Sequence, residues 1–401
     1  MTTTAPQLRF FVAMLLAGGC GVIGGSSSDD DTTGSEADCG DGEGHADGSP
    51  VEPGTGRLRV EGNRIVDANG NPVRLTGINW FGLETPNFAP HGLWMRSMDS
   101  MLDQVAALGF NVLRVPFSSQ LLDAASVPNG IDFSQNADLV GLSGLEIMDT
   151  LIEKSAARGL RIILDRHRPG ADSQSELWYT GAYGEERWIA DWVMLATRYR
   201  DNPAVIAFDL HNEPHGAATW GDGSMTTDWR AAATRAGDAI VAANPDVLII
   251  VEGVEAVGAD YYWWGGNLRG AGAAPVELAV PGRVVYSPHD YPASIYPQTW
   301  FSAPDYPANL PGVWEAAWGY LATGGSGAIL VGEFGTKYQT ESDRLWLGAL
   351  ADYIAEHQLS FTYWSLNPNS GDTGGILADD WQTVHEDKMA VIRPLLAPPL
   401  P

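Results

Sequence analysis

Short apolar runs alternate with longer amphipathic segments eight times between residue 57 and the end of the chain. The amphipathic segments have apolar residues at helical spacing, and several of them end in Gly or Asn-Pro, which stop helices. The short runs are apolar almost throughout, as expected for strands that are covered on both faces. These predicted strands lie at 75–80, 111–117, 161–166, 205–210, 247–251, 283–287, 328–331 and 361–366. Eight such units predict an α/β fold, a (β/α)8 TIM barrel.

The main alternative for this alternation is an open, doubly wound sheet. Such sheets bind phosphates with a G-x-G-x-x-G turn after the first strand, and the corresponding segment here reads TGINWFG. A barrel is therefore favoured. Ahead of it, the alternating stretch RLRVEGNRIVDANGNPVRL contains the turn sequence DANGNP, which predicts a short N-terminal hairpin. We assign residues 55–401 to a single barrel domain.

Residues 1–24 are predicted to be a targeting leader. One Arg precedes an apolar run over 10–17 that is too short to span a membrane as a helix, and small residues then precede Cys20. This order predicts a secretory signal peptide or a lipoprotein leader with Cys20 as the lipidated residue. The protein is then expected to be extracellular or on the outer cell surface, with a lipid anchor in the second case.

Residues 25–54 are predicted to be a disordered acidic linker. Between 25 and 50 the chain has eight acidic residues, no Lys or Arg and almost no apolar side chains, so it cannot bury enough surface to fold. Cys39 in this linker is the only other cysteine of the chain. It could form a disulfide with Cys20 if Cys20 is not lipidated. The barrel domain has no thiolate with which to bind a metal.

The charge balance excludes several classes of partner. The net charge is −27, from 50 acidic and 23 basic residues, and no basic patch is visible. Nucleic acids and anionic membrane surfaces are therefore not expected partners. The chain also has 15 Trp residues. Some of them must be buried, but the flat rings of the others would suit a groove that binds sugars.

Polar and aromatic side chains stand where the predicted strands end, and in a barrel the active site is built at those carboxyl ends. Glu213 follows the fourth strand and Glu333 follows the seventh, so two carboxylates are expected to face each other across the barrel mouth. Such a pair predicts glycoside hydrolysis, in which one carboxyl group protonates the leaving oxygen and the other attacks the anomeric carbon. The full set of strand-end residues is Asn79, Trp80, Arg114, Asp165, His167, Asn212, Glu213, Glu252, His289, Tyr291, Glu333 and Trp364.

The sequence resembles glycoside hydrolase family 5, and within it the bacterial endo-β-1,4-glucanases, over about residues 57–395. The motifs HNEP and GEFG follow the fourth and seventh strands, and the stretches LRIILDRHRP, FDLHNEPH, YWWGGNL, YSPHDY, YPQTWF and NPNSGDTGGIL occur in the same order. The resemblance implies a secreted, monomeric endo-β-1,4-glucanase that hydrolyses β-glucan by a retaining mechanism. The His residues lack metal-ligand spacing and the paired carboxylates suffice without a metal, so no metal and no cofactor are expected.

Roles follow from the resemblance position by position. It implies that Glu213 is the general acid/base and Glu333 the nucleophile. Arg114 would keep Glu333 ionised, because a nearby cation favours a carboxylate. The remaining supporting residues would be His167, Asn212, His289, Tyr291 and Trp364. The expected substrate-binding residues are Trp80, Trp178, Trp264, Tyr296 and Gln298.

Other interpretations of the same residues stay open at this point. A β-mannanase or a xyloglucanase would use the same carboxylate pair. A non-catalytic sugar-binding barrel would normally lack one of the two carboxylates. Asp165, Glu252 and Glu255 lack a catalytic motif and are expected to support the site through hydrogen bonds.

Overall fold

The computed structural model describes residues 58–400, all of them in one compact unit. The predictions for the leader at 1–24, for Cys20 and Cys39, and for the acidic linker at 25–54 lie outside the described residues. Within 58–400, no helix is both long enough and apolar enough to cross a membrane.

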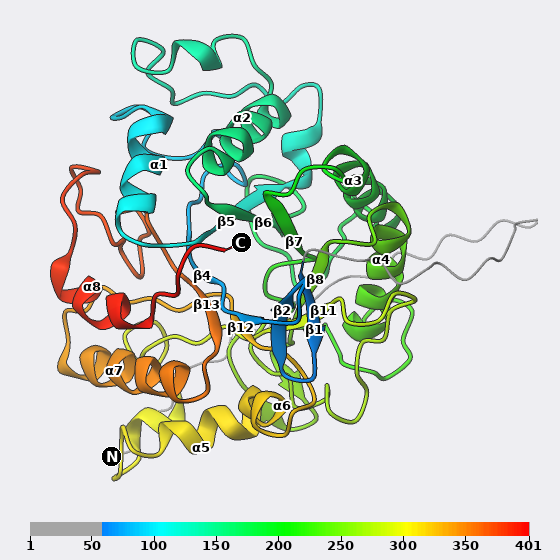
Figure 1. The fold of residues 1–401 in the computed structure, drawn as a ribbon. Coiled ribbons are helices and arrows are strands. Elements are labelled where there is room, and N and C mark those ends of the chain that lie inside the picture. The colour runs from blue at the N-terminus through cyan, green and yellow to red at the C-terminus, as the bar shows by residue number, and fades with distance from the viewer. Residues whose placement is uncertain (1–57, 401) are drawn as a thin grey trace, which may run out of the picture. The chain divides into compact units, whose positions relative to one another are not determined.

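Eight parallel strands form the central sheet, in the order β11-β8-β7-β6-β5-β4-β13-β12 (Figure 1). Parallel bridges from Tyr286 to Ile329 and from His289 to Glu333 join the two edge strands, so the sheet closes on itself. The predicted (β/α)8 barrel is thereby confirmed. The strands are β4 (Thr76–Asn79), β5 (Val112–Ser118), β6 (Arg161–Arg168), β7 (Val205–Asp209), β8 (Leu248–Glu252), β11 (Val284–Ser287), β12 (Leu330–Val331) and β13 (Ser360–Tyr363).

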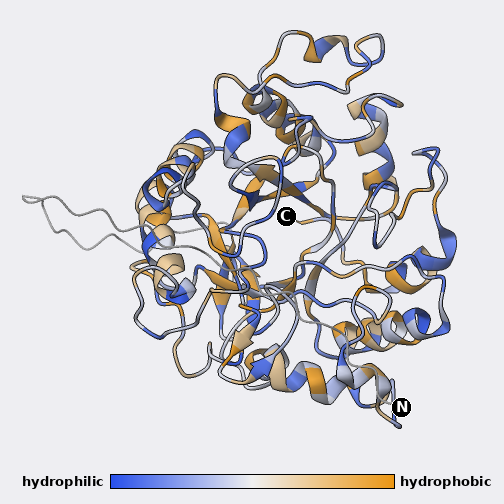
Figure 2. Ribbon diagram, turned by 180° about the vertical axis from the view of Figure 1, so that it is seen from behind, coloured by the Kyte–Doolittle hydropathy of each residue, from blue (hydrophilic) through white to orange (hydrophobic). Residues whose placement is uncertain are grey.

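Helices surround this sheet, and their apolar sides face it while their polar sides face outward (Figure 2). Local sequence sets their ends. Ser143 and Glu146, for example, form a reciprocal capping box at the start of α2, which satisfies backbone N–H groups that the helix itself cannot. The helices are α1 (Met98–Ala107), α2 (Gly144–Ala156), α3 (Glu185–Arg198), α4 (Trp229–Ala243), α5 (Leu310–Trp314), α6 (Tyr320–Thr323), α7 (Glu341–Glu356) and α8 (Glu386–Ile392).

The N-terminal hairpin closes the end of the barrel where the strands begin. It consists of β1 (Leu58–Glu61), β2 (Arg64–Asp67) and the short β3 (Pro72–Val73), paired antiparallel. The N–H of Val60 donates to the carbonyl of Gly282 at 2.8 Å, just before β11. Leu58 and Ile65 pack with the first apolar residues of the barrel strands. The predicted hairpin is therefore present, with a third strand added.

The opposite end of the barrel, where the strands finish, is open. A second hairpin, β9 (Ala256–Val257) and β10 (Asp260–Tyr261), stands beside it and contributes Tyr261 to a surface cleft. The fold thus has one closed end and one end at which the strand-end side chains are accessible.

Candidate active site

A cleft of about 740 Å³ lies over the carboxyl ends of the strands. Glu213 and Glu333 line it from β7 and β12, on different sides of the barrel. One carboxylate oxygen of Glu213 lies within 4.8 Å of one carboxylate oxygen of Glu333. The structure therefore brings together the two residues that the sequence singled out as a catalytic pair.

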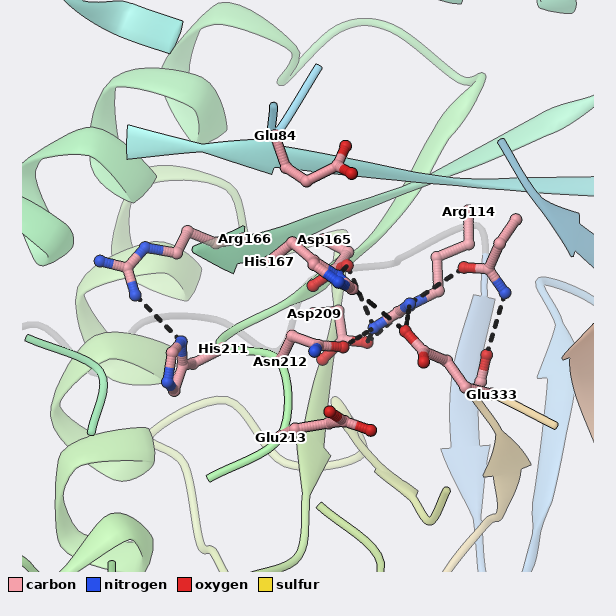
Figure 3. A network of polar contacts seen from close by, with 12 residues as sticks. Glu84, Arg114, Asp165, Arg166, His167, Asp209, His211, Asn212, Glu213 and Glu333 are labelled. Atoms are coloured by element: carbon pink, nitrogen blue, oxygen red, sulfur yellow. Dashed lines mark hydrogen bonds and ion pairs between the residues drawn. The ribbon is translucent and has the colours of Figure 1, made fainter. Parts of the chain in front are cut away.

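Arg114 is the centre of the hydrogen-bond network beneath this pair (Figure 3). It points into the barrel from β5 and is completely buried. Nearby carboxylates raise its pKa well above the ordinary value despite burial, so it is always a cation. Its Nη1 atom donates to Oε1 of Glu333 at 2.7 Å. Its other acceptors are Asn79, Asp209, Asn212 and Glu252, at 2.9 to 3.2 Å.

Glu333 is held at both of its oxygens. Oε1 accepts from Arg114, and Oε2 accepts from the hydroxyl of Tyr291 at 2.7 Å. The side chain is nearly buried, with 4% of its surface exposed. Two donors on a buried carboxylate fix its orientation. Glu333 therefore presents a firmly held carboxyl group to the cleft.

Glu213 is positioned by its backbone as well as by its side chain. Its φ of +54° is in the left-handed region, which is uncommon for a residue other than Gly. Its N–H donates to Oε2 of Glu252 at 2.7 Å, which stabilises this conformation. Its Oε1 lies 3.0 Å from Nδ1 of His289, and its Oε2 accepts from Nε2 of Gln174 at 3.0 Å.

His289 is the second buried cation of the site. It lies 3.3 Å from Glu252 and 3.6 Å from Glu333, in addition to its contact with Glu213. Burial would lower its pKa, but these three carboxylates raise the pKa well above the ordinary value. Burial would likewise raise the pKa of Glu213, but the hydrogen bond and charge of His289 lower it. Glu213 is therefore an anion beside an imidazolium.

His167 and Trp364 form one wall of the cleft. Their rings are stacked at 5.3 Å with an angle of 8° between the planes. Nδ1 of His167 lies 2.6 Å from Asp165, and burial lowers the pKa of His167 to about 3, so this ring is neutral. The proton of His167 is assigned to Nδ1, which donates it to Asp165. Nε2 then carries no proton and can accept a hydrogen bond from a ligand. Asn212 has a buried Nδ2 with no partner within residues 58–400, which a ligand oxygen would satisfy.

The supporting roles expected for the remaining acids agree with the contacts. Glu252 holds the backbone of Glu213, and Asp165 holds His167. Glu255 accepts from the N–H of Gly216 at 2.9 Å. Three groups of His and carboxylate residues lie close enough to share an ion, and all of them adjoin Arg114 or include His289. Those two cations supply the positive charge there, and the lack of a metal stays a prediction.

Three of the five expected substrate-binding residues line the cleft: Trp264, Tyr296 and Gln298. Trp264 is 43% exposed, and its ring stacks on His215 at 3.8 Å. A flat, exposed and supported ring is suited to the face of a sugar.

Trp80 and Trp178 were expected in the same role, and this expectation is wrong. Both are 0% exposed. Trp80 donates from its indole to the carbonyl of His91 at 2.9 Å. Trp178 packs on Trp229 at 5.7 Å, between the barrel and its helices. Neither ring can reach a ligand in the cleft.

Several residues that line the cleft were not predicted from the sequence. Gln174 contacts the candidate acid directly, but it lies in an irregular loop between β6 and α3 where no periodicity predicts its direction. Arg168 lines the cleft from the last position of β6, in a motif that was recognised without a role for this residue. Further cleft residues without a predicted role include Phe81, Glu84, Tyr262 and Trp263.

Comparison with known proteins identifies relatives of the whole domain. The family model for cellulase, glycosyl hydrolase family 5, matches residues 66–370. An endoglucanase of Paenibacillus polymyxa is 54% identical over 348 residues, which cover 86% of this chain and 88% of that protein. The major extracellular endoglucanase of Xanthomonas campestris pv. campestris is 44% identical, over 83% of this chain and 69% of that protein.

A solved structure agrees with these sequence matches. The endocellulase from Pyrococcus horikoshii in complex with cellotetraose superposes with a TM-score of 0.81 at 39% identity, over 85% of this chain and 98% of that chain. The matched region contains Glu213, Glu333 and the residues that hold them. The chain therefore belongs to glycosyl hydrolase family 5, the cellulase family.

Proposed function

We propose that this glycoside hydrolase cleaves internal β-1,4-glucosidic bonds of β-glucans by a retaining double displacement. The observation on which this rests is the separation of the two catalytic candidates, whose nearest oxygens lie within 4.8 Å. Retaining glycosidases have carboxyl groups about 5 Å apart, whereas inverting enzymes leave roughly 6.5–9.5 Å for a water. Glu333 is the nucleophile and Glu213 the general acid/base.

In the first step a carboxylate oxygen of Glu333 attacks the anomeric carbon. The bond between the anomeric carbon and the leaving glucosyl oxygen breaks, and that oxygen takes the proton of Glu213. Arg114 and Tyr291 hold the attacking carboxylate in place. The carboxylate therefore loses little conformational entropy on reaching the transition state. The product of this step is a covalent glycosyl-enzyme.

In the second step Glu213, now an anion, takes a proton from water. The water oxygen attacks the anomeric carbon and releases Glu333 as a carboxylate. The Nδ2 of Asn212, which has no partner within residues 58–400, and the Nε2 of His167 are placed to contact hydroxyls of the sugar in this subsite. Two inversions at the same carbon give net retention.

The substrate class is supported by the relatives and by the cleft. Relatives covering most of this chain are named endoglucanases, and the Pyrococcus horikoshii endocellulase has been solved with cellotetraose. The cleft is open at the surface and lined by Trp264 and Tyr296, as a groove for an internal stretch of polysaccharide should be. Product analysis on carboxymethylcellulose, lichenan, glucomannan and xylan separates this function from mannan hydrolysis.

Paired variants test the two roles. Glu333→Gln should abolish turnover of every glycoside. Glu213→Gln should lose activity on polysaccharide but still form the glycosyl-enzyme from aryl cellobiosides with good leaving groups, which need little protonation. Equal residual activity of the two variants on such substrates would contradict the assignment.

We further propose that the enzyme acts outside the cell as a monomer. The leader sequence and the extracellular Xanthomonas relative support secretion. Lipidation of Cys20 remains a prediction. Cell fractionation of the wild-type protein and of Cys20→Ser tests it, because only a lipidated protein should move from the membrane fraction to the medium on substitution.

A further inference from the structure

Gln174 occupies the cleft wall beside the acid/base candidate. Two backbone contacts fix the loop on either side of it. The N–H of Ala171 donates to the side chain of Gln120 at 2.9 Å, and the carbonyl of Glu176 accepts from the N–H of His215 at 3.1 Å. Within residues 58–400 the amide of Gln174 makes a single hydrogen bond, from Nε2 to Oε2 of Glu213 at 3.0 Å.

The two oxygens of Glu213 therefore have partners of very different exposure. Oε1 contacts His289, which is 0% exposed and lies between Glu252 and Glu333. No sugar can displace that ring. Oε2 contacts Gln174, a partly exposed side chain that lines the cleft. The oxygen of Glu213 that meets a leaving glucosyl oxygen is thus Oε2, and the ligand must take the place of the Gln174 amide.

We propose that Gln174 is a positioning residue that keeps Glu213 ionised in the empty cleft and releases it when a glucan binds. An N–H donor favours a carboxylate, so its withdrawal favours the carboxylic acid. Binding of the chain puts the glycosidic oxygen, which can only accept, against Oε2. Glu213 then takes up a proton from solvent and is ready to donate it. This inference rests on the proposed role of Glu213 as acid/base.

Other charged groups also act on Glu213, and they remain in place when Gln174 is changed. His289, Glu252 and Glu333 face it from the ends of β11, β8 and β12. From β6 it is faced by Asp165 and His167, and from the segment after β11 by Tyr291. A comparison of the wild type with a Gln174 variant therefore isolates the contribution of the amide.

The test is the pH dependence of Gln174→Leu, which keeps the size of the side chain and removes the donor. The alkaline limb of kcat/KM reports the acid in the free enzyme, and that of kcat reports it in the complex. In the variant the limb of kcat/KM should move up by about half to one pH unit, while the limb of kcat stays in place. An unmoved kcat/KM limb, or equal movement of both limbs, would overturn the inference.

Two further variants exclude a merely structural effect. Gln120→Leu loosens the same loop but keeps the donor, so its limbs should match those of the wild type. Gln174→Glu places a like charge beside Glu213 and should move the kcat/KM limb further upward than Gln174→Leu does. A shift in Gln120→Leu as large as that in Gln174→Leu would assign the effect to the loop and reject the proposal.

Failure of the underlying assignment gives a different result. If Glu213→Gln loses as much activity on aryl cellobiosides with good leaving groups as on polysaccharide, Glu213 is not the acid. If Glu213→Gln shows the selective loss but the Gln174→Leu profile is unmoved, only the inference about Gln174 is rejected.

Discussion

Nδ1 of His289 lies 3.0 Å from Oε1 of Glu213. This contact joins a buried cation to the carboxyl group that must lose and regain a proton in each catalytic cycle. The charge of His289 in turn depends on the carboxylates behind it, Glu252 among them. The protonation of the acid is therefore set from inside the barrel as well as from the cleft.

Replacing His289 should move the pH optimum upward. In His289→Gln the imidazolium is lost, so the pKa of Glu213 should rise, because His289 contributes most to lowering it. The alkaline limb of kcat/KM should move up by about one pH unit. His385→Gln, at an exposed position before α8, is the matched control and should leave the profile unchanged. A downward or absent shift in His289→Gln would contradict the electrostatic role of this residue.

Two Trp variants should separate binding from folding. Trp264→Ala removes an exposed ring of the cleft, so we expect kcat/KM on polysaccharide to fall by about tenfold with little change in Tm, since a lost sugar-stacking contact is worth about 1–2 kcal/mol. Trp178→Ala removes a buried ring, which should lower the free energy of unfolding by about 3–5 kcal/mol. Kinetics and thermal unfolding of both variants check this. A stable Trp178→Ala protein would contradict the packing described for that ring.

The buried Lys388 should make stability depend on alkaline pH. Burial lowers its pKa to about 8, and its Nζ donates to the carbonyl of Gly375 at 2.8 Å. Its hydrogen bonds within the described part of the chain include no carboxylate. Between about pH 8 and its ordinary 10.5, the unfolded chain keeps this proton while the folded chain loses it. The free energy of unfolding should therefore rise with pH in that window, and level off above it.

Urea unfolding at pH 7 and pH 9.5 measures this effect. The stability of the wild type relative to Lys388→Met should increase by about 1–2 kcal/mol between the two pH values. Lys154 pairs on the surface with Asp99 and Asp138, and those partners raise its pKa above the ordinary value. The difference between wild type and Lys154→Met should accordingly be constant over the same range. A constant difference for Lys388→Met would show that its ammonium is not destabilised by burial.

The stereochemistry of the first product should follow from the distance between the carboxylates. A nucleophile and an acid with oxygens within 4.8 Å leave no room for a water in the first step. Proton NMR during the first minutes of cello-oligosaccharide hydrolysis should therefore show the β-anomer before mutarotation. An initial α-anomer would contradict the double displacement.

Much of the fold could be predicted because the barrel sequence repeats the same alternation of a short apolar strand and a longer amphipathic helix. All eight barrel strands overlap the predicted ranges, and the polar residues at their ends converge as expected. The eighth strand ends earlier than predicted, at Tyr363, and Trp364 beyond it becomes part of the cleft wall. Strand-end chemistry is thus predictable when the strand itself is regular.

The errors have physical reasons. Asn79 points into the barrel, where it accepts from Arg114, so the alternation of side chains along β4 turns the next residue, Trp80, toward the helices. Trp178 and Gln174 lie in a loop with no period at all. Trp178 lies in the core and Gln174 lines the cleft. Only the three-dimensional contacts of that loop distinguish the two residues.

The closed end of the barrel also determines how this enzyme can be attached to anything else. Leu58 lies there, as an acceptor for Arg283, and so does Pro398, as an acceptor for Asn111 just before β5. Both ends of the described domain are therefore on the side away from the cleft. A bead, a surface or a second module fused at either point would stand behind the catalyst and leave a long polymer free to enter from the front.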